Sequence, residues 1–242
     1  DVICPSGTPI DGPITTSDYF NIPPGSAYLV PQGTYSLSGE LLIDNLIIFD
    51  NCSLIVAPSG FITVNAQMTL TFQNYCLLYG CPSMWQGIVM NQHSTVNVIR
   101  STLRDADKGL NVADNCTFTS VASNFLDCIV GIFVPENMNG QFSNIAGTVT
   151  GTTFGRVLPH LKSGYPGQPT FGLYGRAGIL LNDVGMMTIG DDQQAPNEFF
   201  NLNFGIEIHN SNVDVTNSGF HDIAADVTYA QYGVLKPFGC AI

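Results

Sequence analysis

Positive charge, tryptophan and long apolar runs are all scarce in this chain of 242 residues. Seven Lys and Arg stand against nineteen Asp and Glu, which gives a formal net charge of −12. An acidic surface of this kind repels nucleic-acid phosphates and anionic membranes, so we do not expect nucleic-acid binding. The chain has no run of about 18 or more apolar residues, so no membrane-spanning helix is expected.

Hydrophobic residues make up 45% of the chain and charged residues only 11%, a composition that can bury a substantial core. The sequence begins with Asp1 and shows no positively charged, apolar leader, as expected of a mature secreted product or an excised fragment. It ends on FGCAI with no capping pattern. We therefore expect a secreted or cell-surface protein that is a fragment of a longer chain.

The cysteines lack the paired CxxC framework of a zinc site, so no metal is expected from them. They are Cys4, Cys52, Cys76, Cys81, Cys116, Cys128 and Cys240. Seven is an odd number, so at least one thiol is free or pairs outside the chain, and Cys240 is our candidate. Cys52 and Cys116 stand in the matching phrases DNCS and DNCT, whose Asn51 and Asn115 also form sequons. We expect these phrases to occupy the same turn of a repeat, with both cysteines buried.

The strongest signal is a glycine followed by an aliphatic residue, which recurs along the chain. The pairs are Gly87-Ile88, Gly109-Leu110, Gly131-Ile132, Gly178-Ile179, Gly205-Ile206 and Gly233-Val234. Leu103, Phe125 and Phe199 each stand six residues before such a glycine, and short alternating strands follow it. Because polar turns separate these strands, the repeat predicts an all-β fold, a right-handed parallel β-helix.

Two segments depart from the repeat. Residues 1–27 are rich in proline and predict an irregular N-terminal cap, followed by the β-helix over residues 28–242. Phe154 should precede its glycine by six residues, yet Gly178 follows much later. The excess predicts one long loop insertion within residues 156–176.

Several phrases resemble a known group of proteins. APSGFITVNAQMTLTFQN (57–74), CPSMWQGIVM (81–90) and the glycine coils after them are similar to the large β-helix surface proteins of Bacteroidota, within the pectin-lyase-like superfamily. The resemblance covers roughly residues 46 to 234. It implies a β-helix and export by the type IX secretion system, whereas β-helices of this kind host adhesins, lyases, hydrolases and spacers alike.

Strand alternation predicts one outward-facing column of side chains that is unusually apolar for a solvent-facing sheet. Its members are Val89, Asn111, Phe133, Leu180, Glu207 and Leu235. A covering loop is the first explanation, and a partner protein or a binding groove are the others. Val89, Phe133, Leu180 and Leu235 are the candidate partner-binding residues.

The 156–176 segment concentrates three of the seven basic residues, with aromatic and histidine side chains beside them. Its candidate ligand-binding residues are Arg156, His160, Lys162, Tyr165, Tyr174 and Arg176. Guanidinium groups and aromatic faces suit an anionic or carbohydrate ligand. The alternative is a solvated loop whose cations offset nearby carboxylates, and we favour it.

No complete catalytic set is visible. Glu207 and His209 in GIEIHN alternate onto one face and are weak candidates for an acid–base pair. Asp105 and Asp107 match only the start of a calcium loop, so Ca²⁺ is possible but unsupported and a polar turn is expected. Asp191-Asp192 matches only a fragment of the polygalacturonase aspartate pattern.

The expected function is therefore a non-enzymatic extracellular β-helix module for adhesion, surface display or docking to a partner. A polysaccharide lyase or glycoside hydrolase acting in a groove beside the 156–176 loop is the first alternative. A structural spacer of a large surface protein is the second. The expected partner is a protein or a carbohydrate, and no cofactor is expected.

Overall fold

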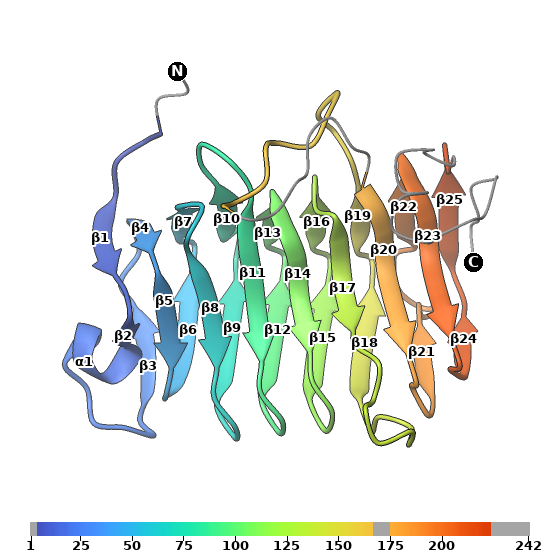
Figure 1. The fold of residues 1–242 in the computed structure, drawn as a ribbon, viewed down its shortest axis with the longest axis horizontal. Coiled ribbons are helices and arrows are strands. Elements are labelled where there is room, and N and C mark those ends of the chain that lie inside the picture. The colour runs from blue at the N-terminus through green and yellow to red at the C-terminus, as the bar shows by residue number, and fades with distance from the viewer. Residues whose placement is uncertain (1–3, 167–174, 224–242) are drawn as a thin grey trace.

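The computed structural model describes residues 4–166 and 175–223 and shows an all-β parallel solenoid. Successive strands pass through three parallel sheets in turn, and each strand pairs with its equivalents in the neighbouring coils. In Figure 1 the coils stack along the horizontal axis, with the N-terminal end at the left. The β-helix predicted from the glycine repeat is confirmed.

We call the three sheets A, B and C. Sheet A contains β1 (Thr8–Asp11), β4 (Thr34–Ser38), β7 (Ser53–Val56), β10 (Leu77–Gly80), β13 (Thr102–Arg104), β16 (Asn124–Leu126), β19 (Thr153–Gly155), β22 (Asn197–Phe200) and β25 (Ser218–His221). Sheet B contains β2 (Ile14–Thr15), β5 (Glu40–Ile43), β8 (Phe61–Val64), β11 (Trp85–Met90), β14 (Ala106–Val112), β17 (Val130–Val134), β20 (Gly175–Asn182) and β23 (Leu202–His209). Sheet C contains β3 (Ala27–Val30), β6 (Leu46–Asp50), β9 (Thr69–Gln73), β12 (Thr95–Ile99), β15 (Thr117–Val121) and β18 (Ala146–Thr150). A two-stranded sheet, β21 (Met187–Ile189) and β24 (Val213–Val215), continues beside β18.

The segment expected to be an irregular cap, residues 1–27, carries regular structure. Its strands β1 and β2 extend sheets A and B by one strand each. The helix α1 (Thr16–Phe20) then lies at the N-terminal end of the solenoid (Figure 1), where its Tyr19 and Phe20 pack against the core. A disulfide between Cys4 and Cys81 ties the segment to a later coil. The segment therefore covers the first coil and also belongs to it.

The recurring glycine has a packing reason. Phe125, Phe154, Phe199 and Phe220 occupy one inward position of sheet A in successive coils, and their rings stack at centroid distances of 5.2, 5.0 and 4.9 Å. A Cβ atom on Gly131 would lie 2.6 Å from the ring of Phe154 and 2.5 Å from a backbone oxygen of the next coil. Glycine at this position leaves room for a large ring in the adjacent coil.

Cys52 and Cys116 are buried, as predicted, and both are free thiols, but they lie at different corners. Cys52 follows β6, where the chain passes from sheet C to sheet A, whereas Cys116 follows β14, where it passes from sheet B to sheet C. The prediction that their phrases share one turn is therefore wrong. Asn51 and Asn115 both adopt left-handed backbone geometry, with φ of 51° and 58°, which asparagine tolerates at either corner. Cys240 lies outside the described residues.

Two long connections interrupt the coils. The predicted insertion follows β19 and ends at β20, and its amber part in Figure 1 reaches back over the solenoid toward β10. A second insertion, residues 135–145, joins β17 to β18 and was not predicted. Asp183 anchors it by accepting the backbone N–H of Asn137 at 3.0 Å. Both insertions border the outer face of sheet B.

Candidate functional site

The predicted outward column is a true row on sheet B. Val89, Asn111, Phe133, Leu180 and Glu207 are in register across β11, β14, β17, β20 and β23. The predicted inward neighbours on one side of this row, Ile88, Leu110, Ile132, Ile179 and Ile206, are all buried. On the other side Met90, Val112, Val134 and Leu181 are buried and Ile208 is partly buried. Leu235 lies outside the described residues.

The insertion after β19 covers part of this row, as expected for the first explanation of its apolar character. Leu161 is 4% exposed and belongs to an apolar cluster outside the main core. The buried members of that cluster are Met84, Ile129, Val130, Leu161, Ala177, Leu180 and Phe204, with Phe133 packed at its edge. Leu180 is therefore covered by the loop, whereas the side chain of Phe133 is only partly buried and remains accessible to solvent.

Charged side chains dock the same loop onto the solenoid. Lys162 Nζ lies 2.8 Å from Asp105 Oδ2 and donates to the backbone oxygen of Gly80 at 2.7 Å. Tyr165 donates its hydroxyl to Asp107 at 3.0 Å. The expected polar turn at Asp105 is thus a buried docking point for the loop. Within the described ranges no group of three or more His, Cys, Asp and Glu residues could hold a metal ion.

Burial shapes the protonation of this docking point. Asp105 is fully buried, and desolvation raises the pKa of its carboxyl although Lys162 and Arg104 offset part of the effect. Burial and the neighbouring Asp107 raise the pKa of Tyr165 to about 12. The tyrosine therefore remains a neutral hydrogen-bond donor at physiological pH.

The candidate ligand-binding residues fall into separate groups. Lys162 and Tyr165 face carboxylates of the solenoid, and the guanidinium of Arg156 donates to the carbonyl oxygen of Pro159. His160 is exposed. Arg176 belongs to β20 and pairs with Glu207, away from the docking point, and Tyr174 lies outside the described residues. The cations whose contacts are described here pair within the protein, as in the alternative that we favoured, and ligand binding by this set stays a prediction.

Beyond the docked loop, the outer face of sheet B opens into a hollow of about 540 Å³. It is lined by Phe133, Pro135, Glu136, Met138, Arg176, Leu180, Asn182 and His209. Met138, on the second insertion, is 97% exposed. Lys108 Nζ lies 5.3 Å from the ring centroid of Phe133, within the range of a cation–π contact. The hollow thus has an apolar floor and a polar rim.

Glu207 and His209 come together at the edge of this hollow. Arg176 donates to both carboxylate oxygens of Glu207, at 3.0 and 2.9 Å, and His209 Nε2 lies 2.9 Å from Oε1. Burial raises the pKa of Glu207, but these hydrogen bonds outweigh it and hold that pKa below its ordinary value. Glu207 is consequently an ionised carboxylate with both oxygens occupied, which suits an ion-pair role better than proton donation. Asn111 shares its row, but β17 and β20 lie between them.

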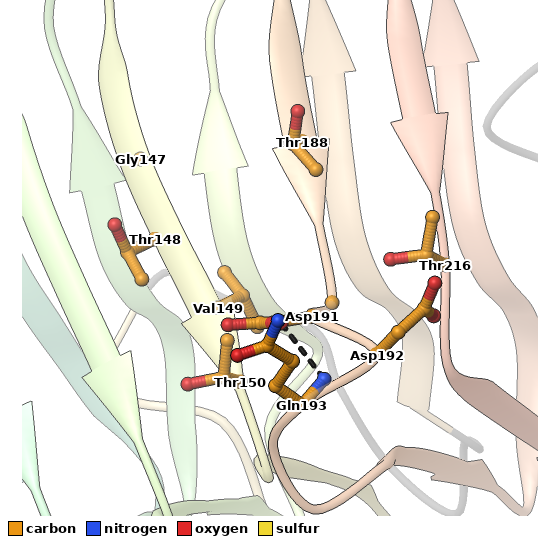
Figure 2. Close-up of a pocket in the computed structure, with 10 residues that line it drawn as sticks. Gly147, Thr148, Val149, Thr150, Thr188, Asp191, Asp192, Gln193 and Thr216 are labelled. Atoms are coloured by element: carbon orange, nitrogen blue, oxygen red, sulfur yellow. Dashed lines mark hydrogen bonds between the residues drawn. The ribbon is translucent and has the colours of Figure 1, made fainter.

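A second hollow, which sequence reasoning missed, lies across β18, β21 and β24. Figure 2 shows its threonines and the acidic turn beside them. Its lining residues are Gly147, Thr148, Val149, Thr150, Thr188, Gly190, Asp191, Asp192, Gln193 and Thr216. The signal in the sequence was the recurrence of threonine at outward strand positions, which strand alternation alone could have revealed.

Comparison of the chain with family models, with curated proteins and with solved structures finds no match. Among the described residues, no helix has the length and apolar character needed to cross a membrane. Over the residues that the structure describes, the fold is a parallel β-solenoid of about eight coils, counted by the strands of sheet B.

Proposed function

We propose that this chain is a non-enzymatic, extracellular β-helix module that docks onto a partner protein through the hollow beside Phe133. The observation that carries the proposal is Met138, a large apolar side chain that is 97% exposed at the rim of that hollow. Exposed apolar groups gathered beside a concave surface are typical of protein interaction sites. An apolar side chain of the partner would fill the hollow.

The surroundings of Met138 support this proposal. Phe142 and Met186 are 60% and 59% exposed, and Gly185 lies close to Phe142. These side chains belong to the second insertion and to the turn that follows β20. Arg176 and His209 add a polar rim that could orient the partner by hydrogen bonds. The combination of an apolar centre and a polar rim is the usual anatomy of a protein interface.

The disulfide between Cys4 and Cys81 supports a secreted or cell-surface location, because such bonds form in oxidising compartments. Display on the surface of a Bacteroidota cell after type IX export is the corresponding proposal for origin. It rests on the resemblance of the coil phrases, as does membership of the pectin-lyase-like superfamily. Adhesion is the biological role that such a displayed docking surface would serve.

The enzyme alternative is less well supported by the geometry. A glycosidase needs a carboxyl that can donate a proton, but the oxygens of Glu207 are occupied by Arg176 and His209. The spacer alternative leaves the exposed Met138 without a role. Both alternatives make different predictions from the docking proposal.

The test is site-specific photocrosslinking on the native surface of the source cells. A benzophenone amino acid at Met138 should capture one protein in stoichiometric amounts, and the same probe at Tyr75, which is 76% exposed at a corner outside sheet B, should not. Phe133→Asp should abolish the capture without unfolding the chain, since Phe133 is only partly buried. Leu180→Asp is unsuitable because Leu180 is 3% exposed beneath the loop.

Capture that is equal at both positions, or that survives Phe133→Asp, would contradict the docking proposal. Hydrolysis or lyase activity on a polysaccharide, lost in His209→Ala, would establish the enzyme alternative instead. No specific capture and no activity would leave the spacer.

A further inference from the structure

The second hollow is a shallow trough on the outer side of sheet C, away from the docking surface on sheet B. Its volume is about 510 Å³. Thr148 and Thr188 stand on β18 and β21, and Thr216 follows β24 (Figure 2). One wall is the turn after β21, in which Asp191 accepts the backbone N–H of Gln193 at 2.9 Å. The trough is therefore lined by hydroxyls with two carboxylates at its side.

One of its hydroxyls makes no hydrogen bond within the described part of the protein. Thr150 is 7% exposed and lines the trough. Over the described residues its side chain makes no hydrogen bond, whereas its backbone oxygen accepts from the backbone N–H of Ala122 and from the hydroxyl of Thr152. A hydroxyl without a protein partner forms its hydrogen bonds with water or with a ligand. The hydroxyl of Thr150 is therefore available to a polar ligand in the trough.

The trough continues into a longer surface that we call the threonine face. It consists of two outward rows on β9, β12, β15 and β18, in register across the four strands. The rows are Thr69, Thr95, Thr117 and Ala146, and Thr71, Asn97, Thr119 and Thr148. Neither row contains a charged residue, in a chain whose formal net charge is −12. Thr148 belongs to both the face and the trough.

We propose that the trough and the threonine face bind a neutral polysaccharide chain lying across the strands. Hydroxyls that both donate and accept match the hydroxyls of a sugar, and the carboxylates of Asp191 and Asp192 can accept two of them. Neighbouring strands are about 4.8 Å apart, so the chain would meet a new pair of side chains at each coil. That repeat is close to the length of one sugar unit in an extended polysaccharide.

The composition of the trough selects against other ligands. None of its lining residues is cationic, so an acidic polysaccharide, a phosphate or a nucleic acid would meet only negative charge. Val149, its one aliphatic lining residue, is 1% exposed, so the trough offers little surface to an apolar side chain of a protein. A neutral ligand rich in hydroxyls fits this chemistry best.

The test is native electrophoresis through gels that contain a dissolved polysaccharide. The neutral polymers are hydroxyethylcellulose, dextran, galactomannan and soluble starch, and polygalacturonate is the acidic comparison. At least one neutral polymer should retard the protein, and polygalacturonate should not. Thr188→Lys should weaken that retardation at least about tenfold, because the longer side chain occupies the trough; tenfold corresponds to about 1.4 kcal/mol.

Two further variants make the result specific. Thr34→Lys places the same lysine on an exposed strand position of sheet A and should bind as the parent does. Asp192→Asn keeps the shape of the exposed turn and should weaken binding by removing a charged acceptor. Thermal unfolding curves should match the parent for all three variants, because each site is exposed.

Retardation by no neutral polymer, or by polygalacturonate alone, would overturn the proposal. Equal retardation of the parent and Thr188→Lys would overturn it as well, since the polymer would then bind elsewhere. The docking proposal concerns sheet B and survives any of these results.

Discussion

Replacing Lys162 by methionine should destabilise the folded chain, mainly because the buried carboxylate of Asp105 loses its nearest cation. Lys162 is the nearest cation to Asp105 Oδ2, at 2.8 Å, and the Asp105 side chain is fully buried. Removing one partner of a buried ion pair costs about 3 to 5 kcal/mol. In the variant, Arg104 Nε would still lie 3.5 Å from the same oxygen, and the Lys162 side chain that is removed is itself 25% exposed. We therefore expect the low end, a loss of about 3 kcal/mol at pH 7.

The pH dependence of this loss follows from the raised pKa of Asp105. A carboxyl whose pKa is higher in the folded state than in the unfolded state takes up a proton on folding, so its protonation favours the folded state as the pH falls. Methionine removes the opposing cation and raises that pKa further. The deficit of Lys162→Met should therefore shrink as the pH is lowered below 7 through this pKa, toward the ordinary value for Asp of about 3.9.

The assay is urea unfolding followed by circular dichroism at pH 7 and at pH 5, with the free energy of unfolding extrapolated to water. Lys108→Met is the matched control, because Lys108 pairs with the less buried Asp107, and it should cost under about 1 kcal/mol. Lys162→Met combined with Asp105→Asn should recover much of the loss. A deficit below about 0.5 kcal/mol, or one that grows in acid, would refute the reasoning.

Two further predictions concern the solenoid itself. Gly131→Ala should cost at least about 2 kcal/mol in urea unfolding, because the new Cβ would lie 2.6 Å from the ring of Phe154; Gly33→Ala, with its nearest side chain at 3.8 Å, should be neutral within about 0.5 kcal/mol. Equal stability of the two variants would contradict the packing account. Cys4→Ser should lower stability by about 4 kcal/mol, as expected when a cross-link over 77 residues is removed, and a reducing agent should reproduce that loss in the parent but not in the variant. A change in melting temperature with reductant in the variant would show that the cross-link is not the cause.

The solenoid was predictable because one steric relation repeats in every coil. The phenylalanine ring of the next coil leaves no room for a side chain at position 131. A glycine and a large residue therefore recur together in the sequence at each coil. The outward row was equally predictable, since strand alternation fixes which side chains share a face. The insertion after Phe154 showed itself as an excess of residues over that period.

The contacts of the candidate sites do not repeat along the chain, so the sequence pattern could not predict them. Lys162 meets Asp105 across 57 residues, and its partner depends on how the loop folds back rather than on any local pattern. The second insertion was missed because its anchor, Asp183, lies 46 residues beyond Asn137. Corner turns were also ambiguous, because Asn51 and Asn115 suit two different corners equally well.

The two proposed surfaces divide the molecule by chemistry as well as by place. The basic side chains of Lys108 and Lys162 and the exposed Met138 lie at the outer face of sheet B, whereas the threonine face on sheet C is uncharged along its whole length. A spacer would need neither surface, and a single-site enzyme would need only one. A module that holds a protein on one face and a neutral polysaccharide on another would link the two, which is the physical requirement of an adhesin. Phe133→Asp and Thr188→Lys should then abolish different halves of that link, and one variant that abolished both would show that the faces are not independent.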